Sequence, residues 1–260
     1  MPELIFIEGV SGVGKSTMVR MLSEELRKLG YYVREYEESD YTNPLDFYCT
    51  AYFPPDKFKE LLTKYKSFAE AIQMNTVCAG NVRLIRYYNK DIPLFDEPLL
   101  SELSLNEFCY NPRQLVSIKE YTSVYKEVWS NWASALDEIY DFIIFDGSLL
   151  HHPINDMMRN YNIDGEQAIY HITTLLSSLN NIKRRILYMK TNNIGKQLTK
   201  AYSDRKQGTL TNEKIDFWEK RYKIDLIVLH NIREKYQIYD VSSENWDSVR
   251  KQILDNLAQN

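Results

Sequence analysis

The stretch LIFIEGVSGVGKSTMVRML, residues 4–22, constrains the fold of this chain more than any other. It begins as an apolar run typical of a buried strand, passes through a glycine-rich turn, and continues with apolar residues at helical spacing. Its middle, residues 9–16, satisfies the pattern G-x-x-x-x-G-K-[ST]. A strand before this pattern and a helix after it are the context that distinguishes a phosphate-binding loop from a chance match.

The residue types of this loop suit a phosphorylated ligand. Glycines let successive backbone N–H groups turn toward an anion, and the N-terminus of the following helix adds a partial positive charge. Lys15 is expected to reach the β- and γ-phosphates of a nucleotide, and the Ser16 hydroxyl to hold Mg²⁺. The predicted binding residues are Gly9, Val10, Ser11, Gly12, Val13, Gly14, Lys15, Ser16 and Thr17.

Five short apolar runs predict the strands of one sheet. Their continuous character, clearest in the first and third runs, suits strands buried on both faces of a parallel sheet, and helical patterns separate them. This order predicts an α/β fold with a doubly wound parallel sheet. The runs are Leu4–Val10, Tyr32–Tyr36, Phe142–Phe145, Arg185–Met189 and Gln237–Val241.

The gap between the second and third runs is too long for one crossover connection. We expect a mostly helical insertion at about 50–140, with helices over 56–73 and 117–139 and an irregular, proline-containing segment over 89–112. No linker, repeat or low-complexity tract appears, so residues 1–260 are predicted to form a single domain.

A phosphate-binding loop of this kind needs a carboxylate that supports the metal, and two segments offer one. FIIFDG places Asp146 at the end of an apolar strand, whereas IPLFDEP places Asp96 and Glu97 after an apolar run. The second run contains Pro93, and proline is rare in central strands because it lacks the N–H that the ladder requires. We therefore predict that Asp146 and Ser16 hold Mg²⁺, and that the other two carboxylates lie in a solvated loop.

Acidic residues follow the second run, in EYEESDYTNP. The carboxyl edge of a parallel sheet faces the site crevice, so a carboxylate there can accept a proton from a substrate hydroxyl or bind substrate directly. We predict Glu38 for the role of base, with Glu37 and Asp40 as alternatives. A solvated acidic loop is the interpretation that assigns them no function.

The segment KTNNIGKQLTKAYSDRKQ, after the fourth run, predicts a lid helix at about 192–208. Its cations Lys196, Lys200 and Arg205 would lie beside the nucleotide, where a mobile cationic helix can close over a phosphoryl group. Arg205 is the best candidate because a guanidinium binds phosphate oxygens bidentately. The alternative is a solvated basic helix face.

Just after Asp146, the segment LLHHPINDMM gathers two histidines, an asparagine and an aspartate. The chain has four histidines and no H-E-x-x-H pattern, so a metal site is not indicated. We expect a surface loop here, with the border of a substrate pocket as the alternative. The residues in question are His151, His152, Asn155 and Asp156.

The composition excludes several classes of function. With 32 basic and 36 acidic residues and a formal net charge of −4, no global field favours nucleic acid. The three cysteines are far apart, so neither a disulfide framework nor a zinc site is expected. No basic segment opens the chain and no apolar run approaches the ~20 residues of a membrane helix. We therefore expect no signal peptide, no membrane partner and a cytoplasmic location.

Four segments in order resemble one family: LIFIEGVSGVGKST, EESDYTNPLD, FIIFDGSLLHHPIN and LYMKTNNIGKQLTKAYSDR. They resemble the P-loop kinases of the thymidylate kinase and deoxynucleoside kinase group, and most closely a poorly characterised bacterial branch of it. The resemblance implies a three-layer fold with a five-stranded parallel sheet in the order 2-3-1-4-5. It also implies an insertion that shapes the acceptor pocket and a lid that carries Arg205.

The chain departs from this group at two places. Gly147 and Ser148 follow Asp146 where the group usually has an arginine that helps bind the acceptor, and Asn43 stands where the branch more often has histidine. These departures leave the acceptor unassigned.

The leading prediction is an ATP- and Mg²⁺-dependent phosphotransferase, a kinase, that acts on a small molecule such as a nucleoside or nucleotide. The alternatives are a regulatory P-loop NTPase and a nucleotide-binding module without an acceptor. Expected partners are ATP, a small-molecule acceptor and, as a further candidate, a second copy of the chain, but not nucleic acid. The predicted catalytic residues are Lys15, Glu38, Asp146 and Arg205.

Overall fold

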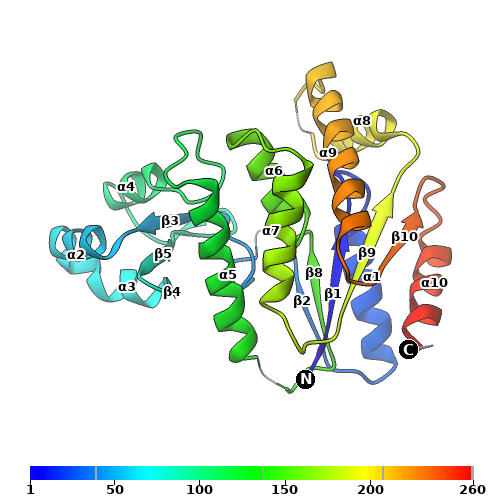
Figure 1. Cartoon of the computed structure of the whole chain (residues 1–260), viewed down its shortest axis with the longest axis horizontal. Helices are drawn as coiled ribbons and strands as arrows, with labels where there is room; N and C mark the ends of the chain where they lie inside the picture. Colours follow the sequence, from blue (N-terminus) through cyan, green and yellow to red (C-terminus); the bar gives the residue numbers. More distant parts are fainter. Residues whose placement is uncertain (39, 137, 207, 259–260) are drawn as a thin grey trace.

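A computed structural model describes residues 1–38, 40–136, 138–206 and 208–258. Its centre is a five-stranded sheet with helices on both faces (Figure 1). The strand order is β10-β9-β1-β8-β2, and every neighbouring pair is parallel. The strands are β1 (Glu3–Glu8), β2 (Val33–Tyr36), β8 (Phe142–Asp146), β9 (Arg184–Lys190) and β10 (Tyr236–Asp240).

All five apolar runs form strands of this sheet, with ends that differ from the predicted ones by no more than two residues. Counted by chain position within this sheet alone, the strands lie in the order 2-3-1-4-5, as the resemblance implies. The labels β8 to β10 are higher only because short strands of the insertion come between. The fold is therefore the predicted α/β fold with a parallel sheet.

The central strand β1 is buried along its whole length, and its side chains alternate between two cores. Leu4 and Phe6 belong to one core, and Ile5 and Ile7 to the other. Successive side chains of a strand point to opposite faces, so a strand covered on both sides requires an unbroken apolar run. The first core is covered by α5 (Ile118–Ser134), α6 (His151–Asn160), α7 (Gly165–Ser177) and α9 (Asn212–Asn231), the second mainly by α1 (Lys15–Lys28) and α10 (Trp246–Ala258).

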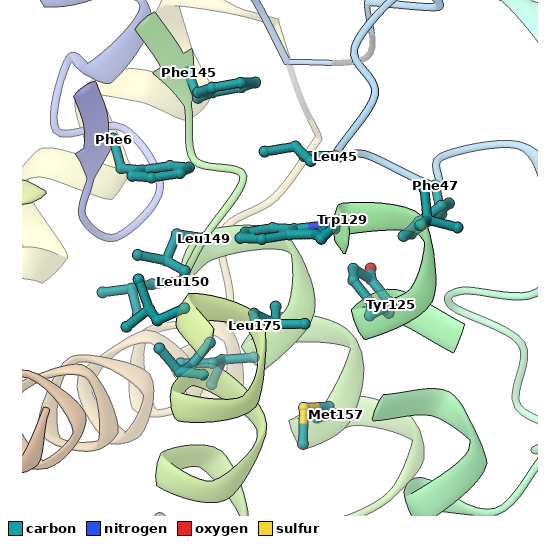
Figure 2. Close-up of a cluster of buried hydrophobic side chains, with 14 of the residues drawn as sticks. Phe6, Leu45, Phe47, Tyr125, Trp129, Phe145, Leu149, Leu150, Met157 and Leu175 are labelled. Atoms are coloured by element: carbon teal, nitrogen blue, oxygen red, sulfur yellow. The ribbon is translucent and has the colours of Figure 1, made fainter. Parts of the chain in front are cut away.

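Aromatic rings fill the first core beneath the end of β8 (Figure 2). Phe6 stacks on Phe145 with ring centroids 5.2 Å apart, and Trp129 of α5 lies parallel to Phe6 at 6.1 Å. Leu149 and Leu150, which follow β8, are fully buried in the same core. This packing anchors the turn between β8 and α6.

The insertion between β2 and β8 is less helical than predicted. It contains a three-stranded antiparallel sheet, β3-β5-β4, a two-stranded sheet, β6-β7, and a core of its own. The prediction missed these strands because β6 and β7 have two residues each, while β3, β4 and β5 show no strict alternation of apolar and polar residues. The strands are β3 (Thr50–Phe53), β4 (Thr76–Ala79), β5 (Val82–Arg86), β6 (Tyr88–Asn89) and β7 (Ile92–Pro93).

Helices account for most of the remaining insertion. The predicted helix over 56–73 is divided into three elements, and the segment over 89–112, predicted to be irregular, contains α4. The predicted lid helix is present as α8 (Ile194–Asp204). No described helix is long and apolar enough to cross a membrane. The helices of the insertion before α5 are α2 (Pro55–Lys64), the 3₁₀ helix η1 (Lys66–Phe68), α3 (Ala69–Met74) and α4 (Leu99–Leu105).

Candidate active site

The loop of residues 9–17 leaves β1 and enters α1 with its backbone shaped by two glycines. Gly9 has φ of 143°, and a Cβ there would come within 2.6 Å of the Met189 carbonyl oxygen. Gly14, at φ 85°, is the N-cap of α1, and no side chain caps this helix. The first turn of α1 also lacks acidic residues. The N–H groups of that turn and the helix dipole therefore favour an anion.

A cavity of about 280 Å³ opens above this loop. It brings together Glu38 from the end of β2 and Arg205 from the end of α8 with the loop residues Ser11, Gly12, Gly14, Lys15, Ser16 and Thr17. Three residues predicted to bind the nucleotide do not line it. The side chains of Val10 and Val13 instead pack in the second core beneath the loop, and Gly9 has none. We infer that these three serve the loop through their backbone.

The lid helix α8 rests directly on the loop. Gln197 donates from Nε2 to the Gly12 carbonyl oxygen at 2.7 Å. Lys200 lines the cavity and forms an ion pair with Glu244, whereas Lys196 is exposed and does not line it. Of the three lid cations predicted from the sequence, the structure thus brings two to the cavity, Lys200 and Arg205.

Asp146 ends β8 and is fully buried, and neither of its carboxylate oxygens has a hydrogen-bond partner among the described residues. Burial raises the pKa of Asp146, while the charge of Lys15 and the side chain of Ser16 act in the opposite direction. A buried carboxylate without a partner is costly and uncommon unless a ligand completes it. Carboxylate and hydroxyl oxygens are ligands that Mg²⁺ accepts, so Asp146 and Ser16 fit the ion.

The rival carboxylates lie elsewhere. Asp96 and Glu97 are exposed on the insertion, in the turn between β7 and α4. Glu97 accepts a hydrogen bond from the Ser101 backbone N–H at 3.2 Å, which stabilises the start of α4. This position agrees with the predicted solvated loop.

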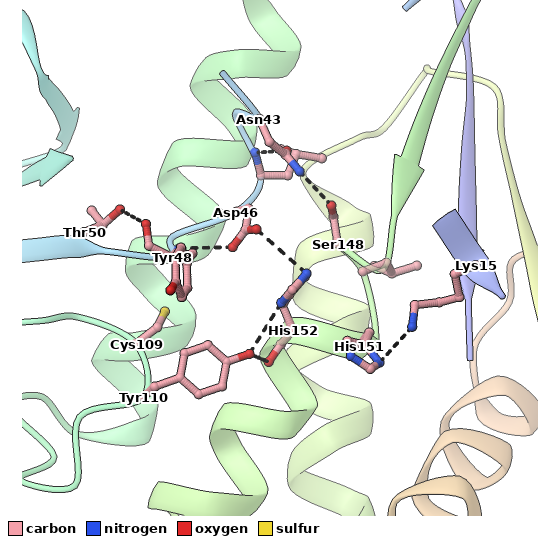
Figure 3. A network of polar contacts seen from close by, with 12 residues as sticks. Lys15, Asn43, Asp46, Tyr48, Thr50, Cys109, Tyr110, Ser148, His151 and His152 are labelled. Atoms are coloured by element: carbon pink, nitrogen blue, oxygen red, sulfur yellow. Dashed lines mark hydrogen bonds and ion pairs between the residues drawn. The ribbon is translucent and has the colours of Figure 1, made fainter. Parts of the chain in front are cut away.

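Lys15 is buried and makes its contacts on the side of α6 (Figure 3). Its Nζ lies 3.4 Å from the Val10 carbonyl oxygen and 3.4 Å from Nδ1 of His151. The same Nδ1 lies 2.9 Å from the Gly9 carbonyl oxygen, which can only accept, so we assign the imidazole proton to Nδ1. Burial, with the charge of Lys15 second, lowers the pKa of His151 well below its ordinary value. A neutral His151 therefore supports the first residue of the loop.

Glu8 is a site residue that the sequence analysis missed. It ends β1 directly before the loop, is fully buried, and accepts the backbone N–H groups of Leu149 at 2.8 Å and His151 at 2.9 Å. Burial raises its pKa to about 7 against the opposing effect of these hydrogen bonds. Glu8 thus caps the N-terminus of α6 from a neighbouring strand and ties α6 to the loop. The available signal was a single acidic residue inside the apolar run 4–10.

The segment predicted to be a surface loop, residues 151–156, is instead the buried start of α6. Pro153 does not prevent this helix, because the N–H groups of a first turn have no partner within the helix. The structure buries the four residues in question, His151, His152, Asn155 and Asp156.

A polar network beside α6 connects it to the chain after β2 and to the insertion (Figure 3). His152 Nε2 lies 3.8 Å from Asp46 Oδ2, and the Tyr110 hydroxyl donates to the His152 carbonyl oxygen at 3.2 Å. Asn43 donates from Nδ2 to Ser148 Oγ at 3.0 Å. Asp46 and Tyr110 were not predicted as site residues, because they are far from each other and from α6 in the sequence.

The structure separates Glu38 from the two alternative acidic residues. Glu38 borders the cavity above the loop, whereas Glu37 and Asp40 line a different hollow, beside Arg34 of β2. The Glu38 side chain is exposed to solvent at the cavity, although protein atoms surround its carboxylate. The desolvation by these atoms raises the pKa of Glu38, but the charges of His152, Lys15 and Arg205 outweigh it and lower the pKa. Glu38 is therefore ionised at neutral pH and lies closest to the nucleotide loop. Its role as a base stays a prediction.

Comparisons with known proteins agree with this architecture. No protein-family model matches the chain, and no curated protein matches it. Among solved structures, thymidylate kinase from Candida albicans is similar with a TM-score of 0.50 and 16% sequence identity, over 100% of this chain and 92% of that one. Deoxyadenosine kinase from M. mycoides is similar with a TM-score of 0.43 and 16% identity, over 98% of each chain. This chain has a P-loop nucleotide kinase-like fold. At such identity the likeness shows the fold alone, and the bacterial branch stays a prediction.

Proposed function

We propose that this protein is an ATP- and Mg²⁺-dependent kinase that transfers the γ-phosphoryl group of ATP to a small molecule. The observation that carries the proposal is the buried, partnerless carboxylate of Asp146 next to Ser16 and Lys15. A loop that merely connected a strand to a helix would have no use for this costly arrangement. A nucleotide with its metal ion would complete it.

In this proposal one end of the site, formed by the loop of residues 9–17 and Asp146 and called here the nucleotide end, binds the nucleotide and neutralises the charge of its phosphates. The N–H groups of the loop and the Lys15 ammonium hold the β- and γ-phosphates, while Ser16 and Asp146 hold the metal ion. When bound, Mg²⁺ neutralises charge on the phosphate oxygens as the bond to the leaving group breaks. Lys15 is poised for this role because it already lies at the loop, against Val10.

Transfer to an acceptor needs a base and a cation opposite the loop, and Glu38 and Arg205 supply them. Both border the same cavity, and the charge of Arg205 contributes to the low pKa of Glu38. Glu38 accepts the proton of the acceptor, and Arg205 approaches the transferred phosphoryl group from the lid.

The test is to measure ADP release by the purified chain with Mg·ATP, alone and with a library of small-molecule acceptors. ADP release that depends on one acceptor supports the kinase. Turnover of equal rate without any acceptor contradicts it and indicates a regulatory NTPase. Binding of ATP without turnover under every condition also contradicts it and indicates a binding module. Omission of Mg²⁺, with EDTA present, is expected to abolish release.

A further inference from the structure

Three segments converge around Glu38, and the third of them borders the nucleotide loop as well. They are residues 36–38 and 40–49, which run from the end of β2, residues 106–112 in the insertion, and residues 146–158 from the end of β8 into α6. Besides the contacts of His152 already described, the Tyr110 backbone N–H donates to Asp156 Oδ1 at 2.8 Å and joins the second segment to the third. The Asn43–Ser148 hydrogen bond joins the first to the third. Together with Glu38 they form the wall that an acceptor would meet, and we call them the acceptor wall.

The acceptor wall contains no lysine and no arginine. It does contain several carboxylates. Glu37 and Asp40 face the hollow beside β2, which we call the outer hollow, and Asp146 belongs to the nucleotide end. Those that remain on the acceptor side are Glu38, Asp46, Glu107 and Asp156.

Among the described residues, three arginines from outside these segments reach the wall. Arg221 of α9 donates to the Leu150 carbonyl oxygen and to Asn155 Oδ1 and pairs with the buried Asp225, and Arg34 of β2, which lines the outer hollow, donates to Thr42 Oγ1.

The guanidinium of the third arginine is also engaged. Arg86 of β5 donates to the backbone carbonyl oxygens of Tyr41, Asn43 and Asp46, the second at 2.6 Å. It also lies over the Tyr41 ring, 5.6 Å from its centroid. Arg86 therefore shapes the turn after β2 and is not available to bind a phosphate.

Besides Asp146, three described side chains of the wall are more than nine-tenths buried and still have an atom without a hydrogen-bond partner: Asp46, His152 and Asp156, the last through its Oδ2. Asp46 is 5% exposed and leaves Oδ2 unpaired, and His152 is 8% exposed and leaves Nε2 unpaired. At 3.8 Å these two atoms are too far apart for a good hydrogen bond to each other. Figure 3 shows both, with Tyr110, pointing toward one another. Buried polar atoms of this kind are what a ligand hydroxyl would satisfy.

We infer that the acceptor is an uncharged alcohol and not a phosphate monoester. This inference rests on the proposed function. A phosphate monoester would bring about two negative charges toward Glu38 and Asp46, with no free guanidinium in the wall to compensate them. Nε2 of His152 already faces the Asp46 carboxylate at 3.8 Å. The wall instead offers acceptors and a hydroxyl, which suit the O–H groups of a neutral compound.

Transfer of the γ-phosphoryl group to an alcohol needs no group beyond ATP, the acceptor and Glu38. The acceptor oxygen forms a bond to the γ-phosphorus, the bond between that phosphorus and the β,γ-bridging oxygen breaks, and ADP leaves. The proton of the acceptor hydroxyl passes to the Glu38 carboxylate and then to solvent. A phosphate monoester is mostly a dianion at neutral pH, so the oxygen that attacks carries no proton. The ionised Glu38 would then have no proton to accept.

The test compares uncharged alcohols with their own phosphate monoesters on the wild-type chain. ADP release is measured with Mg·ATP and nucleosides, deoxynucleosides, hexoses or polyols, each paired with its monophosphate. We expect kcat/KM for the best alcohol to exceed that of its monophosphate by at least ~10²-fold, the difference of one unpaired buried charge. A preference for the monophosphates would overturn the inference and leave the kinase intact. Failure of both classes with ATP still bound would overturn the proposed function as well.

A variant of Asp46 tests whether the alcohol binds at the acceptor wall. Asp46→Asn is expected to raise KM for the alcohol by ~10-fold, the cost of about one hydrogen bond to a charged group, with KM for ATP unchanged. Asp56→Asn, on the exposed start of α2, is the matched control and should change neither. Equal changes in both KM values, or none in either, would contradict a direct contact between Asp46 and the acceptor.

Discussion

The two ends of the site have opposite electrostatic character. At the nucleotide end, four cations border the cavity over a helix N-terminus that no side chain caps. At the acceptor wall, lysine and arginine are absent from all three segments. The four cations are Lys15, Arg20, Lys200 and Arg205.

Under the proposed function, this difference indicates which part of the reaction each end serves. A cation-rich pocket stabilises a ligand whose negative charge is concentrated, as it is on the phosphates of a nucleotide. An acidic wall excludes a second strongly charged anion and accepts hydroxyl groups. The shared fold therefore fixes where phosphate binds, while the local side chains decide what receives it. Four predictions test this division, in order of decreasing effect on activity.

Lys15→Ala should remove the chemistry of the nucleotide end. Loss of a cation that contacts the transferred group is expected to lower turnover by ~10³-fold. The fold should survive, because among the described residues the Lys15 ammonium lies at hydrogen-bonding distance from Val10 and His151 alone. Steady-state ADP release and circular dichroism check the two parts. Lys28→Ala, at the exposed end of the same helix, is the control. ADP release by the Lys15 variant at the wild-type rate would contradict the assignment of the loop as a phosphate-binding site.

Asp146→Asn should weaken the metal dependence. An amide keeps the shape but loses the charge that attracts Mg²⁺, so we expect ~10²-fold lower activity at limiting Mg²⁺ and partial recovery at high Mg²⁺. Titration of activity with MgCl₂ measures this. Asp96→Asn, on the exposed turn before α4, should titrate like the wild type. The reverse ranking of the two variants would move the metal site to the insertion.

Glu38→Gln should slow transfer and spare nucleotide binding, which separates the two ends experimentally. A general base contributes ~10²–10⁴-fold, and we expect the lower end of this range. Single-turnover transfer and calorimetric titration of ATP give the two quantities. Glu37→Gln is the matched control, since Glu37 lines the hollow on the other side of β2. If the Glu38 variant transfers at the wild-type rate, the base lies elsewhere.

Glu8→Gln should change how the free energy of unfolding depends on pH. Glu8 is a buried ionisable residue that connects the loop to the start of α6. Burial raises the pKa of Glu8 from 4.5 to about 7. Its contribution to the free energy of unfolding is therefore fully present below pH 4.5 and is lost as the pH rises through 7, a change of about 3 kcal/mol. Glutamine does not ionise and should lack this loss.

Urea unfolding of both proteins at several pH values between 4.5 and 8 checks the prediction. The buried neutral histidines act in the opposite direction, since the lowered pKa values of His151 and His171 cost stability as the pH falls below 6.5. That contribution is common to both proteins and cancels in their difference. A difference that does not vary with pH would contradict the burial of an ionisable Glu8.

The sequence predicted the nucleotide end and the sheet far better than the acceptor wall. The phosphate-binding loop is contiguous, and its glycines, lysine and serine each have one physical task, so a short pattern defines it. The strands of the sheet are buried on both faces and therefore carry unbroken apolar runs. Asp146 could be predicted because it ends such a run. The lid helix could be predicted from its apolar spacing.

The acceptor wall could not be predicted in this way, because long-range packing assembles it. Asp46 meets His152 across more than a hundred residues, and Tyr110 reaches α6 from the insertion. Asp156 and His152 were expected on a surface loop, since nothing local reveals that Glu8 caps the helix that buries them. The short strands β3 to β7 were missed because none of them shows a strict alternation of apolar and polar residues over four residues or more.

The contact between the loop and α10 has a spectroscopic consequence. Trp246 lines the nucleotide cavity, and a Cβ on Gly14 would lie only 2.2 Å from its indole ring. The other three tryptophans pack in the protein interior, two of them in the first core and one against His151. The chain therefore carries a tryptophan that lines the nucleotide cavity, whereas the three segments of the acceptor wall contain no tryptophan of their own. Changes in indole emission would time the arrival of the nucleotide separately from the arrival of the acceptor, without any attached label.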